Sequence, residues 1–265
     1  MNVRKLSALA LTILLTPSIA WSATVALPAS KDTSIFSEST SNSGGGSPGI
    51  FAGNNGSGGI RRGLIAFDLS SIPAGSTITQ AELKLYVGNA PGSSPAQTVS
   101  IFPLTKNWGE GTTGSSNPTL SGGGGGAAAV APDATWANAA TPSTPWATAG
   151  GDFAGVASAS VGSITATTNT PYIWSSAAMV THVQGWLDNP ATNFGWILRN
   201  ASDAGSQTVR GFYSRESGTG ASSALTTAFQ PSLSITYVPE PASAVLLLFA
   251  GQMLLLRRRS FAWAR

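Results

Sequence analysis

The sequence has no cysteine and only one histidine, and it is poor in charged side chains. Without cysteine the chain forms no disulfide, so its stability must come from core packing, with a bound metal ion as one further source. Charged residues make up 9% of the chain, against about 25% in average soluble domains. The surface is therefore expected to be polar without being ionic. The deficit does not predict disorder, because patterned apolar segments recur along the chain.

The basic residues are concentrated at the two ends of the chain. Of the 14 Lys and Arg, six lie at positions 4, 5, 257, 258, 259 and 265. Between Ala23 and Val238, eight Lys/Arg stand against ten Asp/Glu, a formal net charge of −2. A nucleic-acid-binding domain needs a basic face of its own. The charge distribution therefore excludes a nucleic-acid partner.

The N-terminus has the pattern of a secretory signal peptide. Arg4 and Lys5 precede an apolar run over 6–19, and Ala20-Trp21-Ser22 places small residues where a signal peptidase reads them. The run is shorter than the ~20 residues that a membrane span needs, which argues against an anchor helix. We predict that residues 1–22 are removed by signal peptidase and that the mature chain begins at Ala23.

The C-terminus has a second topological pattern. Pro239, Glu240 and Pro241 are followed by an apolar segment, 242–256, and by the basic cluster 257–259. Neither a strand nor a helix can continue through the two prolines, so this segment is predicted to be extended and accessible between the domain and the apolar helix. The apolar helix would reach roughly 22 Å, which bilayer thinning and snorkelling can accommodate. The arginines would stay cytoplasmic, leaving the domain outside the inner membrane.

This ordered ending resembles the PEP-CTERM sorting signal of Gram-negative bacteria. The resemblance covers 239–265 and implies that an exosortase-type enzyme recognises and processes the tail at the inner membrane. It also implies a protein that is transiently anchored and then reaches the cell surface or the extracellular matrix, in association with exopolysaccharide and biofilm.

The region between the two ends, 23–238, is about 215 residues long, enough for one sizeable core. Gly/Ser-rich stretches at 37–59, 109–129 and 217–223 are read as loops. A helix is predicted over 179–187, where apolar residues recur every three or four positions until Asn189-Pro190. Short strands with period-two alternation or apolar runs are predicted at 65–69, 81–87, 194–198, 208–214 and 233–237. The fold class is therefore all-β, an antiparallel jelly-roll β-sandwich with one short helix.

Several runs in this region, in order, resemble a DNRLRE domain. They are RGLIAFDLSSIPAG (62–75), AELKLY (81–86), NWGEG (107–111), TW (135–136), VQGWLDNP (183–190), FYSRES (212–217) and PSLSITY (231–237). The family is similar to the family-96 carbohydrate-binding modules, and the resemblance implies an extracellular jelly roll, some relatives of which bind acidic polysaccharide. Relatives often have an acid at the position of His182, so any role of that acid is in doubt here.

No catalytic residue is predicted. Ser-His-Asp chemistry would have to use His182, the one histidine. The run Gly45–Gly49 matches G-x-S-x-G, but Pro48 lacks the N–H that the oxyanion hole requires. A glycosidase needs two placed carboxylates, and nothing pairs the available ones, Asp68, Glu110, Asp152 and Glu216. A lyase or hydrolase would require two or three of these polar residues to converge in a cleft.

Tryptophans next to loops are the candidates for sugar binding, because indole faces stack on the apolar faces of pyranose rings. These are Trp108, Trp136, Trp146 and Trp174. They could equally pack under long loops as satellite cores. Trp186 and Trp196 are at core-like positions.

A carboxylated sugar would favour arginine forks, and Arg215 is the candidate we single out among Arg61, Arg62, Lys106, Arg210 and Arg215. Arg215 could instead form a structural ion pair with Glu216. A structural calcium ion is the only cofactor considered, with Asp32, Asp68 and Glu216 as its candidate ligands, although no EF-hand spacing is present.

Two hypotheses follow from these observations. The first is an exported, non-enzymatic surface or matrix protein that binds polysaccharide. The second is a structural or adhesive glycosylated surface protein without a ligand site. Exposed aromatics in a shared groove would favour the first, and tryptophans buried under loops would favour the second.

Overall fold

A computed structural model describes residues 21–92, 94–114, 120, 125–201, 203, 205–219 and 226–240. The predicted all-β class with one short α-helix is confirmed for these residues. The predicted signal peptide, apart from its last two residues, and the C-terminal apolar helix lie outside them. No helix in the described part of the chain is long and apolar enough to cross a membrane. The elements are β1 (Ala23–Phe36), β2 (Asn42–Ser43), β3 (Gly49–Asn54), β4 (Ile60–Phe67), β5 (Thr77–Asn89), β6 (Gln97–Pro103), β7 (Ala127–Ala128), β8 (Asn138–Ala140), β9 (Thr144–Pro145), β10 (Ala159–Ile164), β11 (Thr170–Trp174), α1 (Ala177–Asp188), β12 (Trp196–Asn200), β13 (Arg210–Tyr213) and β14 (Ser232–Val238), with short 3₁₀ turns at Pro190–Thr192 and Thr227–Phe229.

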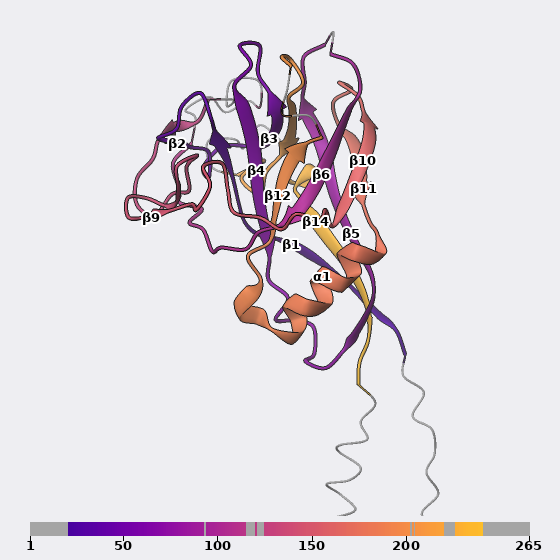
Figure 1. Ribbon diagram of the computed structural model, residues 1–265. Coiled ribbons are helices and arrows are strands. Elements are labelled where there is room, and N and C mark those ends of the chain that lie inside the picture. The colour runs from indigo at the N-terminus through magenta and orange to yellow at the C-terminus, as the bar shows by residue number, and fades with distance from the viewer. Residues whose placement is uncertain are drawn as a thin grey trace, which may run out of the picture.

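The strands pair antiparallel throughout, and apart from the separate β8–β9 pair they form two groups (Figure 1). In the first group β14 lies between β1 and β5, and β5 also pairs with β11 and β13. In the second group β4 lies between β1 and β12, followed by β6 and β10. Strands β1 and β3 pair in both groups, so they connect the two sheets at their edges. This is the architecture of a β-sandwich, and strands shared by both sheets are compatible with a jelly roll.

The main core lies between the two sheets. Strand β5 places Leu83, Leu85 and Val87 inside, all fully buried, with the polar residues between them facing outward. They pack in one cluster with residues of the opposite sheet such as Ile65 and Leu198. The period-two pattern therefore reports a half-buried strand, as the sequence predicts.

Helix α1 covers one end of this core. Ser176 caps it by accepting a hydrogen bond from the Met179 N–H at 3.0 Å, and Met179, Val183 and Trp186 are buried. The Trp186 ring packs edge-on against Trp196 of β12, with centroids 4.6 Å apart. The predicted helix is confirmed and extends two residues further at its N-terminus and one at its C-terminus.

A second apolar layer covers the outer face of β4 and β12. The long excursion between β6 and β10 contributes Trp108 and Trp146, which cluster with Leu64 and Ile197. Trp196 and Leu198 belong to the main core while Ile197 belongs to this layer. Strand β12 is thus buried on both faces, as its apolar run predicts.

The prediction of a loop over 37–59 is wrong in part. Strand β3 lies inside this stretch, and all six of its residues are buried. It pairs with β13 and with β4. Gly53 has φ 111°, and a Cβ there would lie 2.7 Å from the Thr208 carbonyl oxygen, so the backbones can meet only at glycine. Gly53, one of the glycines that suggest a loop, is thus required by close strand packing.

Candidate functional site

Three of the four tryptophans predicted to stack on sugar lie in the apolar cores, as the alternative of satellite packing predicts. Trp108 is 3% exposed, Trp146 5% and Trp174 0%. Each indole N–H donates to a backbone oxygen at 2.8–2.9 Å, that of Phe194, Thr135 and Val99 respectively. The first two belong to the layer on β4 and β12, and Trp174 belongs to the main core. With their faces and N–H groups occupied by protein, they have no surface left for a pyranose.

Trp136 is different, because it is half-buried and begins a stack of alternating aromatic and guanidinium groups. We name the residues Trp136, Arg62, Phe153, Arg199 and Phe102 the aromatic–arginine strip. The Arg62 guanidinium lies 4.8 Å from the Trp136 ring centroid and 5.7 Å from that of Phe153. The Arg199 guanidinium lies 4.7 Å from Phe153 and 5.6 Å from Phe102. Cations over aromatic faces at these distances attract the rings electrostatically.

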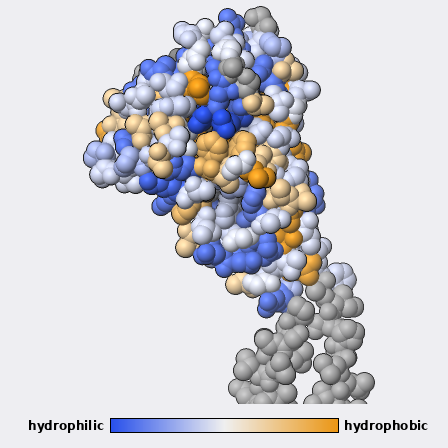
Figure 2. All heavy atoms as spheres, viewed as in Figure 1, coloured by the Kyte–Doolittle hydropathy of each residue, from blue (hydrophilic) through white to orange (hydrophobic). Residues whose placement is uncertain are grey.

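Both arginines of the strip are held by Asp203. Asp203 Oδ2 accepts from Arg62 Nη2 at 2.6 Å and from Arg199 Nη2 at 2.5 Å. Burial alone would raise the pKa of Asp203, but the hydrogen bonds from Arg199 and Arg62 outweigh it and lower the pKa. Two cations and one anion leave the group with one excess positive charge. In Figure 2 a hydrophilic area borders an apolar one over the part of the sheet where β4, β12 and β6 lie.

The local backbone explains how Arg62 is fixed. Arg62 Nη1 donates to the Gly150 carbonyl at 2.7 Å, and Gly150 has φ 92°. A Cβ at Gly150 would lie 2.6 Å from Arg62 Nη1 and 2.8 Å from the Trp136 ring. Glycine is therefore required where the excursion turns against the strip. Arg61, the preceding residue on β4, pairs with Glu38 at 2.9 Å.

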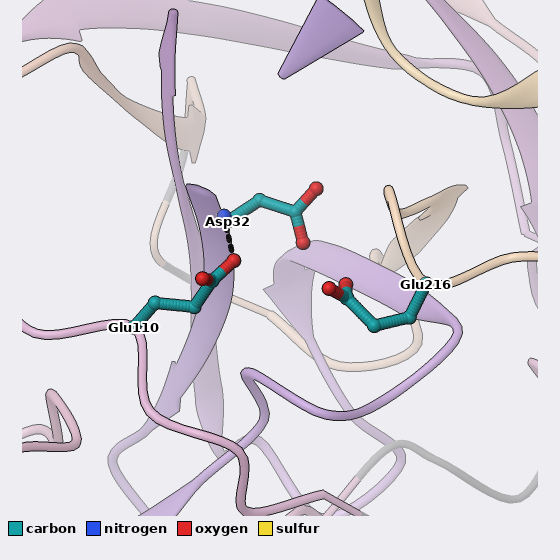
Figure 3. A group of neighbouring side chains, drawn as sticks. All are labelled: Asp32, Glu110 and Glu216. Atoms are coloured by element: carbon teal, nitrogen blue, oxygen red, sulfur yellow. Dashed lines mark hydrogen bonds between the residues drawn. The ribbon is translucent and has the colours of Figure 1, made fainter. Parts of the chain in front are cut away.

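Three carboxyl groups meet at a second place. Asp32 lies on β1, Glu110 in the excursion after β6, and Glu216 just after β13. One oxygen from each can be chosen so that all three lie within 4.8 Å of one another. Figure 3 shows the three side chains converging from separate segments, with the carboxyl group of Asp32 directed toward that of Glu216. We name these residues the acidic cluster.

Hydrogen bonds tie the acidic cluster together around Arg215. The Asp32 N–H donates to Glu110 Oε1 at 2.7 Å, and the Arg215 N–H donates to Asp32 Oδ2 at 2.9 Å. Arg215 Nε contacts Glu110 Oε1 at 2.7 Å and Glu216 Oε1 at 2.8 Å. Two oxygens, Asp32 Oδ1 and Glu216 Oε2, are buried without a hydrogen-bond partner. An unsatisfied buried polar group costs about 1–3 kcal/mol, and more when it is charged.

The protein environment disfavours charge on all three acids. Burial, followed by the charge of Glu216, holds the pKa of Asp32 well above its usual range. Burial raises the pKa of Glu216 to about 7, although Arg215 opposes the shift, and burial also raises the pKa of Glu110. An acid whose pKa is raised by folding stabilises the fold below its ordinary pKa, and this contribution is lost as the pH rises through the shifted value. A cation among the three groups would offset this penalty and favour their charged forms.

The predicted calcium ligands are only partly brought together. Asp32 and Glu216 belong to the acidic cluster, but Asp68 does not. Asp68 is exposed after β4, where its carboxylate accepts from the N–H and the Oγ–H of Ser70, both at 2.9 Å. This is a local turn contact. Glu110 is the acid that the ligand prediction missed, although it lies in the NWGEG run.

The Arg215 guanidinium pairs with Glu110 and Glu216. The alternative of a structural ion pair is the one that the geometry favours. Of the predicted sorting motif, Pro239 and Glu240 directly follow β14, with Glu240 exposed, and Pro241 lies outside the described residues.

A pocket of about 500 Å³ lies between the turn after β4 and the end of α1. Its lining includes Asp68, Pro73, Ala74, Trp186 and Asn193. A volume of this size is in the range of small-ligand pockets, but Trp186 is only 6% exposed and offers little surface for stacking.

Of the four carboxylates considered for a glycosidase, Glu110 and Glu216 come together in the acidic cluster, where both pair with Arg215. Ser47 and His182, the residues of the Ser-His-Asp alternative, are engaged in other contacts. Ser47, in the G-x-S-x-G run, is 1% exposed. His182 Nδ1 is hydrogen-bonded to Ser158 Oγ at 2.8 Å, and Ser158 Oγ also accepts from Trp196 Nε1 at 2.8 Å. The histidine thus takes part in packing α1 against β12.

Residues 23–149 match the family model described as Carbohydrate-binding module family 96, and the predicted resemblance to that family is confirmed over this stretch. The matched stretch supplies Asp32, Arg62, Glu110 and Trp136. A comparison with curated proteins found no match.

Proposed function

We propose that this protein binds an acidic polysaccharide outside the cell without catalysing a reaction, and that the aromatic–arginine strip is the binding surface. The match of residues 23–149 to a carbohydrate-binding module family carries the proposal, because it supports a carbohydrate ligand independently of any one side chain.

The chemistry of the strip supports the choice of surface. Aromatic rings with partly accessible edges and faces suit the apolar C–H faces of sugars. Guanidinium groups match planar carboxylates in a bidentate geometry. The Arg199 side chain is 25% exposed. Arg62, Arg199 and Asp203 together keep one positive charge. A uronate-containing chain lying across the strip would find both kinds of partner.

The cellular setting belongs to the same proposal. Signal peptidase would remove 1–22, and an exosortase-type enzyme would process the tail 239–265 after transient anchoring in the inner membrane. The protein would then act at the cell surface or in the extracellular matrix of a Gram-negative bacterium, as part of an exopolysaccharide or biofilm. The exposure of Glu240 directly after β14 supports access of such an enzyme to the motif.

One observation favours the alternative, a structural or adhesive glycosylated surface protein with no ligand site. Trp108, Trp146 and Trp174 are buried, and burial under loops is what that alternative predicts. The two functions differ in one measurable property, which is saturable binding of a glycan by the folded protein.

The experiment measures binding of the purified full-length chain to a polyuronate and to an uncharged β-glucan. We expect saturable binding to the polyuronate, weakened at least about tenfold by Arg199→Gln or Trp136→Ala, since a lost charge-assisted contact is worth about 1.5–3 kcal/mol. Arg61→Gln is the matched control, because Arg61 is the neighbour of Arg62 on β4 but pairs with Glu38. Binding should survive Arg61→Gln.

Two other results would overturn parts of the proposal. Ala74 lines the 500 Å³ pocket, and Ala74→Trp would obstruct it from an exposed position. If Ala74→Trp abolished polyuronate binding while Arg199→Gln did not weaken it, the binding site would be the pocket and not the strip. No binding of any glycan by a folded protein would leave the structural alternative.

A further inference from the structure

We propose that the carboxylates of Asp32, Glu110 and Glu216 bind one calcium ion that fastens β1 to the segments after β6 and β13. The proposal is independent of glycan binding, since it concerns different residues from those of the aromatic–arginine strip.

The spacing of the acidic cluster fits such an ion. Calcium binds carboxylate oxygens at about 2.3–2.6 Å, so two ligands on opposite sides of it are about 4.6–5.2 Å apart. One oxygen from each of the three acids lies within 4.8 Å of the others. In Figure 3 the carboxyl group of Asp32 is directed toward that of Glu216, and the carboxyl group of Glu110 lies beside the Asp32 backbone N–H, which donates to it.

A second observation points to a missing ligand. Asp32 is 0% exposed, and its Oδ1 has no hydrogen-bond partner while Oδ2 accepts from the Arg215 N–H. Glu216 Oε2 is likewise buried without a partner. Buried carboxylate oxygens are normally satisfied by donors, water or a metal ion. A cation between these two oxygens would satisfy both.

The charge balance favours a divalent cation. When all three carboxylates are ionised, as metal ligands are, they carry −3, and Arg215 is the one cation in direct contact with them among the described residues. Lys31 is nearby, but its Nζ donates to Asn107 Oδ1 and to the Trp108 carbonyl. A charge of −2 therefore remains. Arg215 contacts Oε1 of each glutamate, which leaves Glu216 Oε2 available.

The donor set favours calcium over other metals. The chain has no cysteine, and its one histidine is on α1, bonded to Ser158. Zinc prefers nitrogen and sulfur ligands, whereas carboxylates that come from separate segments give the flexible oxygen cage that calcium accepts. Magnesium requires a near-ideal octahedron with shorter bonds and so should bind more weakly.

The experiment treats the purified full-length protein with a chelator and then titrates calcium by calorimetry, without glycan. We expect one saturable site, and a melting temperature raised by about 5–10 °C when free calcium is 100-fold above Kd. Magnesium at the same concentration should raise it less. Terbium should bind at the same site and luminesce through Trp108, two residues before Glu110.

Asp32→Asn and Glu216→Gln should abolish the calcium effect. Asp68→Asn should leave it intact, because the Asp68 carboxylate lies outside the acidic cluster and accepts hydrogen bonds from Ser70. The wild-type titration decides the matter even where a variant fails to fold. The proposal is overturned by a folded wild-type protein that shows neither calcium heat nor a shift in melting temperature. It is equally overturned by calcium binding that persists in both cluster variants.

Discussion

The backbone N–H of Arg215 donates to Asp32 Oδ2 at 2.9 Å, although 183 positions separate the two residues in the chain. This contact brings the segment after β13 against β1 and places the Arg215 side chain between two glutamates. The main-chain donor orders the site and the side chain neutralises it. The two roles can be separated by mutation, because substitution keeps the N–H.

Arg215→Gln should lower the stability of the calcium-free protein by about 0.5–1 kcal/mol, a modest loss because the side chain is 40% exposed. The calcium-dependent rise in melting temperature should become larger, since the remaining charge on the three acids increases. Urea unfolding with chelator and with calcium measures both effects. Polyuronate binding should not change. A loss of binding would restore Arg215 as a sugar ligand.

Trp174→Ala should destabilise the protein by about 3–5 kcal/mol, because it removes a large, fully buried side chain and its bond to the Val99 carbonyl. Trp174→Phe should retain much of the packing and cost less. Trp136→Ala, at a half-buried position, serves as the comparison and should cost less still. Denaturant titration ranks the three variants. Equal costs for Trp174→Ala and Trp136→Ala would contradict the assignment of Trp174 to the core.

His182 should contribute to the pH dependence of the unfolding free energy, and this contribution should be absent in His182→Asn. Burial lowers the pKa of His182, so the unfolded chain takes up the proton at higher pH than the folded one. Its contribution is therefore present above the unfolded value near 6.5 and is lost as the pH falls through the folded value. Protonation of Nδ1 would also remove the acceptor that Ser158 Oγ–H can use.

The measurement is the difference in unfolding free energy between the wild type and His182→Asn from pH 8 to pH 5. The acidic cluster is the same in both proteins, so its opposite contribution to the pH dependence cancels in this difference. The wild type should lose more stability than the variant on acidification. NMR titration of the one imidazole gives its pKa directly, and a value above 6.5 would contradict the expectation.

The elements that the sequence predicts well are those whose side chains alternate with a regular period. Strands β5 and β14 alternate between core and solvent, and α1 presents Met179, Val183 and Trp186 on one face. Strand β3 escapes prediction because three of its six residues, Gly49, Ala52 and Gly53, are glycine or alanine and give no alternating pattern. At Gly53 the backbone itself makes the close contact.

The site was harder to predict than the fold, for a physical reason. The excursion between β6 and β10 has little regular structure, so nothing in its pattern reveals that it folds back on β4 and β12 and buries Trp108 and Trp146. The acidic cluster combines three segments whose proximity depends on strand pairing. Residue type alone could suggest Asp32 and Glu216 as ligands, but it could not distinguish Glu110 from Asp68.

Strand β14 ends at Val238 with β1 on one side and β5 on the other. Its antiparallel hydrogen bonds run perpendicular to the strand, so a pull along β14 from its C-terminal end loads both ladders in shear, with many bonds sharing the force. A pull that separated Ala23 from Tyr237, its partner, would instead open the β1 ladder one bond at a time. If the protein were attached through the residues after Val238 and bound a glycan elsewhere on its surface, a pulling force would act along β14, the direction in which the sheet resists unfolding more strongly.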